Sequence, residues 1–159
     1  MTWPDLLFRH ARASTLLAAV LIAGTSFAAV TSAHDVALRP TRTVAMSDRT
    51  MSHRAEYHPY YARKLGHRMA RDFGWHSERQ WRCLKNLWSM ESAWHVHADN
   101  PTNSAYGIPQ ALPGSKMSSA GGHWRTDAST QIRWGIQYVR SRYHGPCGAW
   151  RHKRWHGWY

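Results

Sequence analysis

The stretch LWSMESAW, residues 87–94, belongs to the segment whose apolar pattern decides the fold. It also places one glutamate, Glu91, among large apolar side chains. Inward-facing positions recur there at steps of three or four residues, at Trp81, Leu84, Leu87, Trp88 and Glu91. Such spacing predicts a helix with one apolar face. Glu91 therefore lies on the stripe that faces the core, and the sequence raises the question of what a carboxyl group does there.

Two further helices are predicted on either side of this one. A capping box, Ser77 with Gln80, marks the start of the central helix. The preceding helix ends at Gly74 and has apolar residues at helical spacing: Ala62, Leu65, Gly66, Met69 and Phe73. The following helix is capped by Thr126 or Asp127, and its inner face comprises Ile132, Ile136, Val139 and Tyr143. No segment alternates as a strand does, so the predicted fold is mainly α.

A long loop follows Trp94, with turn-forming residues from Asp99 to Gly122. A loop of this length inside a small domain is either functional or disordered. Its aromatic and amide side chains, Tyr106, Gln110 and Trp124, favour a function.

The front of the chain has the layout of a secretory signal. Basic residues precede an apolar run at 16–30, and small residues follow at 31–33. The run is shorter than the ~20 apolar residues of a membrane-spanning helix. We therefore predict a signal peptide at 1–33 and a secreted protein associated with the cell wall; an uncleaved anchor is the alternative. Residues 34–56 lack an apolar period and are predicted to be a flexible leader, which leaves a domain at 57–159.

Charge and cysteines add two expectations. Residues 57–159 contain fifteen Lys/Arg and five Asp/Glu, a net charge of +10, which indicates anionic partners such as teichoic acids, phospholipid headgroups or nucleic acid, or serves solubility alone. Cys83 and Cys147 are the only cysteines. In an exported protein they are expected to form a disulfide, with two buried thiols as the alternative.

Three segments resemble a known family. They are Glu91-Ser92 followed by Trp94, the stretch AYGIPQ at 105–110, and the stretch from Thr130-Gln131-Ile132 through Gly135 to Tyr138. Together they resemble the lysozyme-like lytic transglycosylases of the soluble-transglycosylase (SLT) type, in particular the small secreted actinobacterial ones. The resemblance covers roughly 57–159. It implies a lysozyme-like α+β domain with a catalytic glutamate on a central helix and a long cleft-forming loop.

The chain also departs from this family's pattern. Ala93 occupies a position where the family commonly has glycine or a small polar residue, and Ser104 occupies a turn position where the family usually has glycine. The late Ala-Tyr-Asn motif of larger relatives is absent, and the segment 142–145 lies in its place. The role of that missing tyrosine is therefore not transferred to any residue here.

The resemblance implies that Glu91 is the general acid and base. Cleavage of a glycosidic bond needs a protonated acid for the leaving oxygen. Apolar neighbours such as Trp88 are expected to raise the pKa of Glu91 toward that of a lysozyme-type acid. The alternative is a structural glutamate paired with an arginine such as Arg133 or Arg140.

Few residues qualify as the second carboxylate that most glycosidases use. The acidic residues outside Glu91 are Glu56, Asp72, Glu78, Asp99 and Asp127. Asp99 is expected to form a turn and Asp127 to cap a helix. This shortage is consistent with a transglycosylase, in which the C6 hydroxyl of the substrate attacks and a 1,6-anhydro-muramic product forms.

The resemblance also implies the substrate-binding residues: Ser92, Tyr106, Gly107, Ile108, Gln110 and Tyr138. Core packing is the alternative for both tyrosines. Among the tryptophans, Trp81, Trp88 and Trp134 are expected in the core, and Trp124 and Trp150 are candidate sugar platforms. His95 and His97 lack a third ligand at zinc spacing, so neither a metal nor a cofactor is predicted.

The predicted activity is cleavage of the MurNAc–GlcNAc bond of peptidoglycan. A lysozyme-type hydrolase on the same fold and a non-catalytic peptidoglycan-binding protein are the competing interpretations. A cationic binder of membranes or nucleic acid leaves Glu91 and its neighbours unexplained. The expected partners are glycan strands and anionic wall polymers; we expect a monomer without specific nucleic-acid binding or stable membrane insertion.

Overall fold

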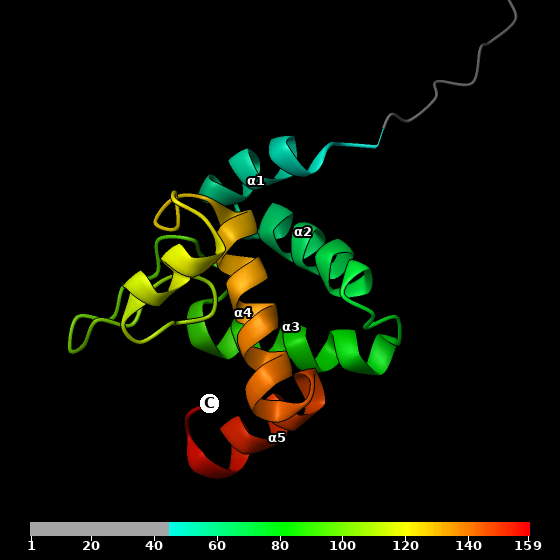
Figure 1. Cartoon of the computed structure of the whole chain (residues 1–159), viewed down its shortest axis with the longest axis vertical. Coiled ribbons are helices and arrows are strands. Elements are labelled where there is room, and N and C mark those ends of the chain that lie inside the picture. Colours follow the sequence, from blue (N-terminus) through cyan, green and yellow to red (C-terminus); the bar gives the residue numbers. More distant parts are fainter. Residues whose placement is uncertain (1–44) are drawn as a thin grey trace, which may run out of the picture. The chain divides into compact units, whose positions relative to one another are not determined.

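The computed structural model describes residues 45–159, and the predicted signal peptide and residues 34–44 of the predicted leader lie outside them. This part of the chain is mainly helical, as predicted (Figure 1). Its elements are α1 (Asp48–Tyr57), α2 (Pro59–Asp72), α3 (Glu78–Ser92), a 3₁₀ helix η1 (Gly114–Ala120), α4 (Ala128–Tyr143) and α5 (Pro146–His156). Within residues 45–159, extended pairing is limited to two isolated bridges, from Tyr106 to Asp99 and to Ala111.

The three predicted helices form where expected. Ser77 caps α3 and accepts a hydrogen bond from the Gln80 backbone N–H at 3.3 Å. The Gln80 side chain does not complete the capping box, since its Oε1 accepts from the Cys147 backbone N–H at 3.3 Å. Asp127, one of the two predicted caps, starts α4.

Two α-helices, and the 3₁₀ helix η1 within the predicted loop, were not predicted. The flexible leader expected at 34–56 is wrong for its last part, because α1 occupies Asp48–Tyr57. Ser47 caps this helix, and Met51, Ser52 and Ala55 are buried against the rest of the fold. The tail of the chain forms α5, which begins at Pro146 in the first turn, a position where proline loses no hydrogen bond.

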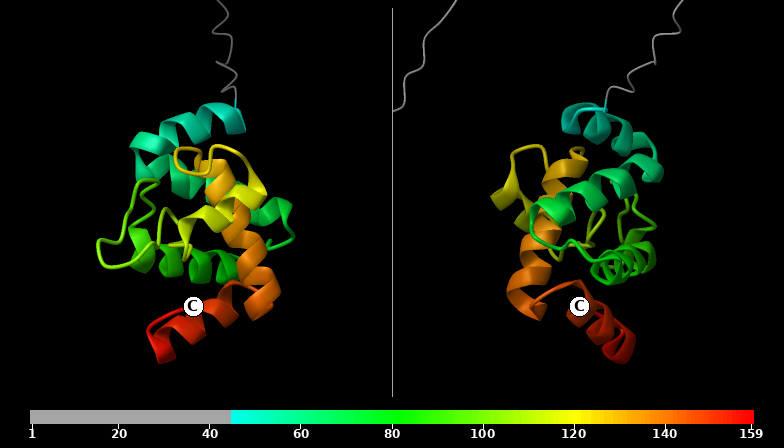
Figure 2. Two further views of the ribbon diagram at one scale, coloured as in Figure 1. Left: turned by 60° about the vertical axis from the view of Figure 1, so that its left-hand side comes forward. Right: turned by 90° about the vertical axis from the view of Figure 1, so that its right-hand side faces the viewer.

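The helices surround α4 on several sides (Figures 1 and 2). α1 and α2 pack against each other and both contact α4. α5 packs mainly on α3 and also contacts α4, and η1 lies against α4. α3 and α4 approach through a side chain, because a Cβ on Gly135 would lie 2.6 Å from the Trp88 ring. Glycine at this position lets the indole lie against the α4 backbone.

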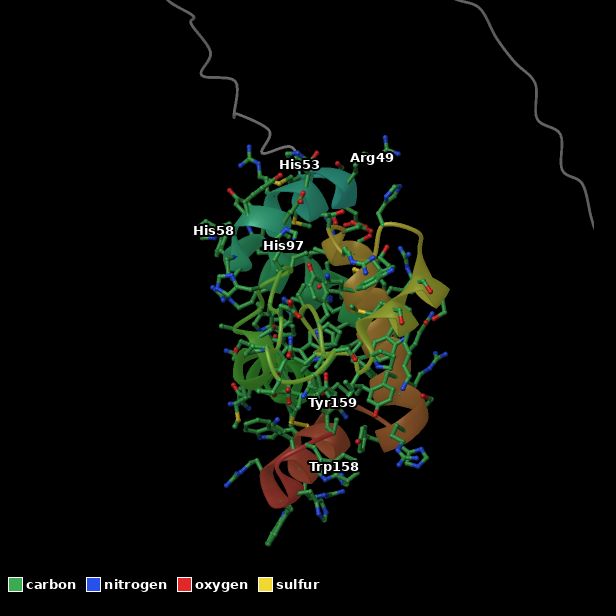
Figure 3. All side chains as sticks on the ribbon, turned by 90° about the vertical axis from the view of Figure 1, so that its left-hand side faces the viewer. Arg49, His53, His58, His97, Trp158 and Tyr159 are labelled. Atoms are coloured by element: carbon green, nitrogen blue, oxygen red, sulfur yellow. A yellow bond between two sulfur atoms is a disulfide. The ribbon has the colours of Figure 1, made fainter. Side chains whose placement is uncertain are left out.

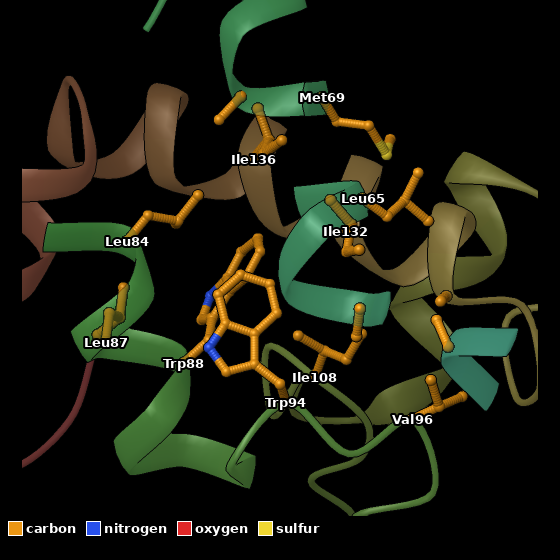
Figure 4. Close-up of a cluster of buried hydrophobic side chains, with 14 of the residues drawn as sticks. Leu65, Met69, Leu84, Leu87, Trp88, Trp94, Val96, Ile108, Ile132 and Ile136 are labelled. Atoms are coloured by element: carbon orange, nitrogen blue, oxygen red, sulfur yellow. The ribbon is translucent and has the colours of Figure 1, made fainter. Parts of the chain in front are cut away.

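The core is built around two indoles (Figure 4). Trp88 lies near the C-terminal end of α3, and Trp94 lies at the start of the long loop. Trp88 and Trp94 are fully buried, and their ring centroids lie 5.0 Å apart in an edge-to-face arrangement. Aliphatic residues from α2, α3, α4 and the loop surround them: Leu65, Leu84, Leu87, Val96, Ile108, Ile132 and Ile136. The core therefore fixes the C-terminal end of α3, which carries Glu91.

The predicted disulfide is present. Cys83 of α3 and Cys147 of α5 are joined, and their Cα atoms lie 4.9 Å apart. The bond fixes the first turn of α5 to the middle of α3. In the part of the chain that the structure describes, no helix has the length and apolar character needed to cross a bilayer.

Candidate functional site

Glu91 lies in the last turn of α3 and is almost excluded from water. Its side chain is 11% exposed, and one carboxylate oxygen lies 2.6 Å from Nζ of Lys153, whose side chain is 15% exposed. The ammonium comes from α5, which the disulfide holds against α3. Glu91 is poorly solvated, as the sequence analysis expected, but a cation that was not expected lies beside it. The ion pair matches the alternative of a paired glutamate in kind, but the cation is Lys153 and not Arg133 or Arg140.

A half-buried tyrosine lies next to this ion pair. The Tyr159 hydroxyl donates to the Pro109 carbonyl at 2.7 Å and accepts from the Trp88 indole N–H at 2.9 Å. Burial raises the pKa of Tyr159 well above its usual 10, and the negative charge of Glu91 raises it further. Tyr159 therefore stays neutral and ties the end of the chain to the loop that follows α3.

The three sequence segments that resemble the transglycosylase family meet at the end of α3. The Ser92 hydroxyl donates to the Ile108 carbonyl at 2.8 Å. The Ile108 backbone N–H donates to Oε1 of Gln131, a fully buried side chain of α4, at 2.8 Å. The Gln131 amide nitrogen donates to the carbonyls of Val96 and Trp124 at 3.0 and 2.9 Å. One polar chain thus links the residue after Glu91, the loop and α4.

This arrangement changes what the loop backbone can do. The Gly107 N–H donates to the Ala98 carbonyl at 2.7 Å, and the Ile108 N–H is used by Gln131. Gly107 has a φ of +76°, and a Cβ there would lie 2.6 Å from the Gln131 side chain. Ser92, Gly107 and Ile108 therefore fix the loop in place, and the two backbone N–H groups are not free to hold the acetamido groups of a sugar.

Gln110 and Tyr138 line a small hollow beside the ion pair. Its volume is about 80 Å³, and it is lined by Pro109, Gln110, Ala111, Leu112, Lys116, Trp134, Tyr138 and Tyr159. The Gln110 amide nitrogen donates to the carbonyls of Ala98 and Gly107, at 3.1 and 3.0 Å. Its oxygen has no hydrogen-bond partner among residues 45–159 and is free to accept one. Glu91 does not line this hollow, whereas Tyr159 faces it and feels the charge of Glu91.

Trp134 differs from its predicted role as a core residue. Its ring stacks on Tyr138 with centroids 5.2 Å apart and planes 8° from parallel, and both rings line the small hollow. Trp81 packs against the core and Trp88 is fully buried, as expected. An aromatic pair on the wall of a hollow is a surface on which a sugar ring can stack.

Tyr106 belongs to a different hollow. Its hydroxyl contacts His97 Nδ1 and donates to the Arg125 carbonyl, both at 3.1 Å. Burial raises the pKa of Tyr106 above 10, followed by the charge of Asp99. The hollow has a volume of about 300 Å³ and includes Ser104 and Trp124. Trp124 is thus on a cavity wall, as a sugar platform would be, but with Tyr106 and not with Tyr138.

Four of the five acidic residues considered as a second carboxylate have other contacts, and Asp72 is exposed at the end of α2. Asp127 accepts hydrogen bonds from Ser52, Ser129 and Thr130 as the cap of α4. Glu56 lies 3.5 Å from His97, and Glu78 lies 3.9 Å from His67. Asp99, predicted to form a turn, bridges to Tyr106. Within residues 45–159, no three or more His, Cys, Asp or Glu side chains gather as a metal site does.

Sequence reasoning missed Lys153 and Tyr159. Neither belongs to a motif, and both reach the site only because α5 folds back along α3. The absence of acidic residues after Asp127 was the one available signal, since it leaves the tail with cations that can pair only with earlier carboxylates. Comparisons with models of known families, with characterised proteins and with solved structures find no match.

Proposed function

We propose that this protein is a secreted lytic transglycosylase that cleaves the MurNAc–GlcNAc bond of peptidoglycan, with Glu91 as the general acid and base. The observation that carries the proposal is the polar chain from Ser92 through Ile108 to Gln131. It brings the three family-like segments together at the end of the helix that carries Glu91. The proposal includes a lysozyme-like arrangement of these helices, with the β part reduced to the two bridges of Tyr106.

The reaction needs Glu91 in two forms. It gives a proton to the leaving oxygen, and afterwards its carboxylate takes the proton of the C6 hydroxyl that attacks the anomeric carbon. Lys153 lies 2.6 Å from a carboxylate oxygen of Glu91 and compensates its charge. The same contact occupies that oxygen, so the incoming glycan has to displace Lys153 to reach it.

Access to Glu91 requires a movement at the end of the chain. Small-molecule sites have volumes of about 300–1,000 Å³, whereas the hollow beside Tyr159 has about 80 Å³. Residues 157–159 follow α5 and close this hollow through Tyr159. A glycan strand that stacks on Trp134 and Tyr138 and donates a hydrogen bond to the Gln110 oxygen would reach Glu91 once Tyr159 moves aside.

Two rival functions use the same geometry. A lysozyme-type hydrolase would place water where the C6 hydroxyl attacks. A non-catalytic peptidoglycan-binding protein is favoured by one observation, the nearly buried ion pair of Glu91 with Lys153. In that case Glu91 would have a structural role and no bond would be cleaved.

A digest of insoluble peptidoglycan separates these functions. The native protein is expected to release muropeptides one water lighter than hydrolysis products, as measured by mass spectrometry. Glu91→Gln is expected to release none, since the amide cannot donate the proton. Glu78→Gln is the matched control, because Glu78 is an exposed glutamate of the same helix and its loss should leave release unchanged.

The outcomes are distinct. Products of full mass indicate the hydrolase, and binding without release indicates the wall-binding protein. Full activity of Glu91→Gln would refute the catalytic assignment of Glu91.

A further inference from the structure

We propose that the outer face of α5 is a second binding site, for an anionic polymer of sugars or polyols joined by phosphodiesters. Two indoles and two guanidinium groups form this face, which we call the α5 face: Trp150, Arg151, Arg154 and Trp155. They line a hollow of about 330 Å³ to which no other element of residues 45–159 contributes a lining residue. The inference locates the anionic partner of a wall-cutting enzyme and so rests on the proposed function.

The charge of the α5 face is uncompensated. No aspartate or glutamate occurs after Asp127, while residues 128–159 contain six Lys/Arg. Within the described part of the chain, Arg151 and Arg154 take part in no ion pair, although Lys153 between them pairs with Glu91. Lys153 of α5 therefore faces inward and pairs with Glu91, whereas Arg151 and Arg154 remain available to a ligand.

One of the two indoles of the α5 face, Trp155, is held out in water, whereas Trp150 is half-buried against the core. Trp155 is 80% exposed, and Trp158 just beyond the helix is 54% exposed. Trp158 and Tyr159 lie beside α5, at the end of the described region that is remote from Arg49 and His53 (Figure 3). A large exposed indole is an unusual cost for a water-soluble domain, and indoles next to cations mark surfaces that bind ligands with both a flat face and a charge.

A second hollow extends the α5 face along the chain. It has a volume of about 260 Å³ and shares Arg151 and Trp155 with the first; Tyr143, Gly148, His152 and His156 complete it. Two adjoining hollows with a shared guanidinium and a shared indole suit consecutive units of a polymer better than a single small ligand. Guanidinium groups pair with phosphodiesters, and indoles stack on the apolar faces of sugars or polyols between them. A flat lipid surface would not require hollows.

Poly(glycerol phosphate) is a suitable probe, and binding is measured by titration calorimetry at two salt concentrations. The native full chain is expected to bind, with affinity that falls as salt rises. Arg151→Gln/Arg154→Gln is expected to weaken binding at least about tenfold, and Trp155→Ala about fivefold, as for loss of charged and stacking contacts to a polyanion. Lys64→Gln/Arg71→Gln on α2 removes the same charge from exposed positions elsewhere and is expected to bind as the native chain does.

Two comparisons identify the partner and separate this site from the catalytic one. Tighter binding to phosphatidylglycerol vesicles or to single-stranded DNA than to the probe would overturn the choice of polymer. Equal weakening by the α2 control would overturn the α5 face, because only net charge would then matter. Glu91→Gln is expected to bind the probe normally, and the α5 variants are expected to cut polymer-free peptidoglycan normally, so failure of either function is recognised independently.

Discussion

At the scale of single residues, the ion pair between Glu91 and Lys153 defines the site. Two opposite charges that are 11% and 15% exposed have given up most of their hydration and compensate each other across 2.6 Å. Removing one partner leaves the other poorly solvated, which costs more than the pair contributes over two neutral groups. The two residues should therefore behave as a unit in stability measurements.

A double-mutant cycle tests this. Lys153→Met is expected to lower the free energy of unfolding at neutral pH by about 1–3 kcal/mol, since the carboxylate loses its counter-charge near the core. In the Glu91→Gln background the same substitution is expected to cost at least about 1 kcal/mol less. Urea unfolding of the native chain, both single variants and the double variant gives the coupling. Strictly additive losses would show that the pair contributes nothing as a pair.

At the scale of elements, the N-cap of α4 holds α1 against α4 through a contact that no sequence pattern predicts. Asp127 accepts from the backbone N–H groups of Ser129 and Thr130 and from the hydroxyl of Ser52 on α1. Burial alone would raise the pKa of Asp127, but the hydrogen bonds from Ser52, Thr130 and Ser129 outweigh it and lower the pKa below 3.8. The ionised carboxylate therefore stabilises the packing of α1 on α4.

This stabilisation should depend on pH. Because the pKa is lowered on folding, the contribution of the charge is fully present above the usual value of 3.8 and is lost as the pH falls through the lower value of the folded state. Asp127→Asn keeps a capping side chain without the charge. It is expected to lower the free energy of unfolding by about 1 kcal/mol at neutral pH. The difference in Tm between the two proteins should shrink as the pH is lowered below 3.8. A difference independent of pH would contradict the role of the charge.

Gln131 has the corresponding role between α4 and the loop. It is fully buried, and its amide satisfies the Ile108 N–H and two carbonyls. Gln131→Leu has nearly the same size but leaves three buried backbone groups unpaired, so it is expected to lower the free energy of unfolding by about 3 kcal/mol or more. Gln137→Leu on the exposed side of α4 is the matched control and should change stability little. Equal effects of both substitutions, measured by urea unfolding, would contradict the role of Gln131 in linking α4 to the loop.

The elements differ in how far the sequence predicts them. α2, α3 and α4 were predictable because each buries a stripe of aliphatic or aromatic residues at helical spacing. α5 was not, since Pro146 and Ala149 are its only buried residues, and the disulfide and the ion pair that hold it to α3 leave no periodic pattern in the sequence. α1 was missed because one of its three buried residues is Ser52, which packs through a hydrogen bond to Asp127.

The candidate site divides in the same way. Glu91, Ser92 and Gln131 could be found because they lie in local motifs whose spacing is visible in the chain. Lys153 and Tyr159 could not, because their proximity to Glu91 depends on how α5 returns along α3, which no local pattern records. The use of the Gly107 and Ile108 backbone N–H groups by Ala98 and Gln131 was likewise invisible before the loop was folded.

At the scale of the whole described region, the disulfide connects two halves of the site. Cys83 and Cys147 are 64 residues apart. A closed loop of that length is worth roughly 4 kcal/mol through the entropy of the unfolded chain. Cys83→Ser/Cys147→Ser is therefore expected to show a markedly lower Tm in thermal unfolding monitored by circular dichroism.

Reduction should act on the native chain in the same direction. The double serine variant is its control, because a reductant has no bond to break there and should leave its Tm unchanged. A native chain whose Tm is insensitive to a reductant that demonstrably frees both thiols would contradict the structural role of the bond.

The position of this bond also bears on when the surroundings of Glu91 are assembled. It fastens the first turn of α5, and the same short helix delivers Lys153 to Glu91 and precedes the tyrosine that covers the hollow. A freshly made chain in a reducing compartment would hold that helix only by its modest packing. The Glu91 carboxylate would then gain its counter-charge only after the thiols are oxidised. Oxidation would therefore be the step that completes the ion pair.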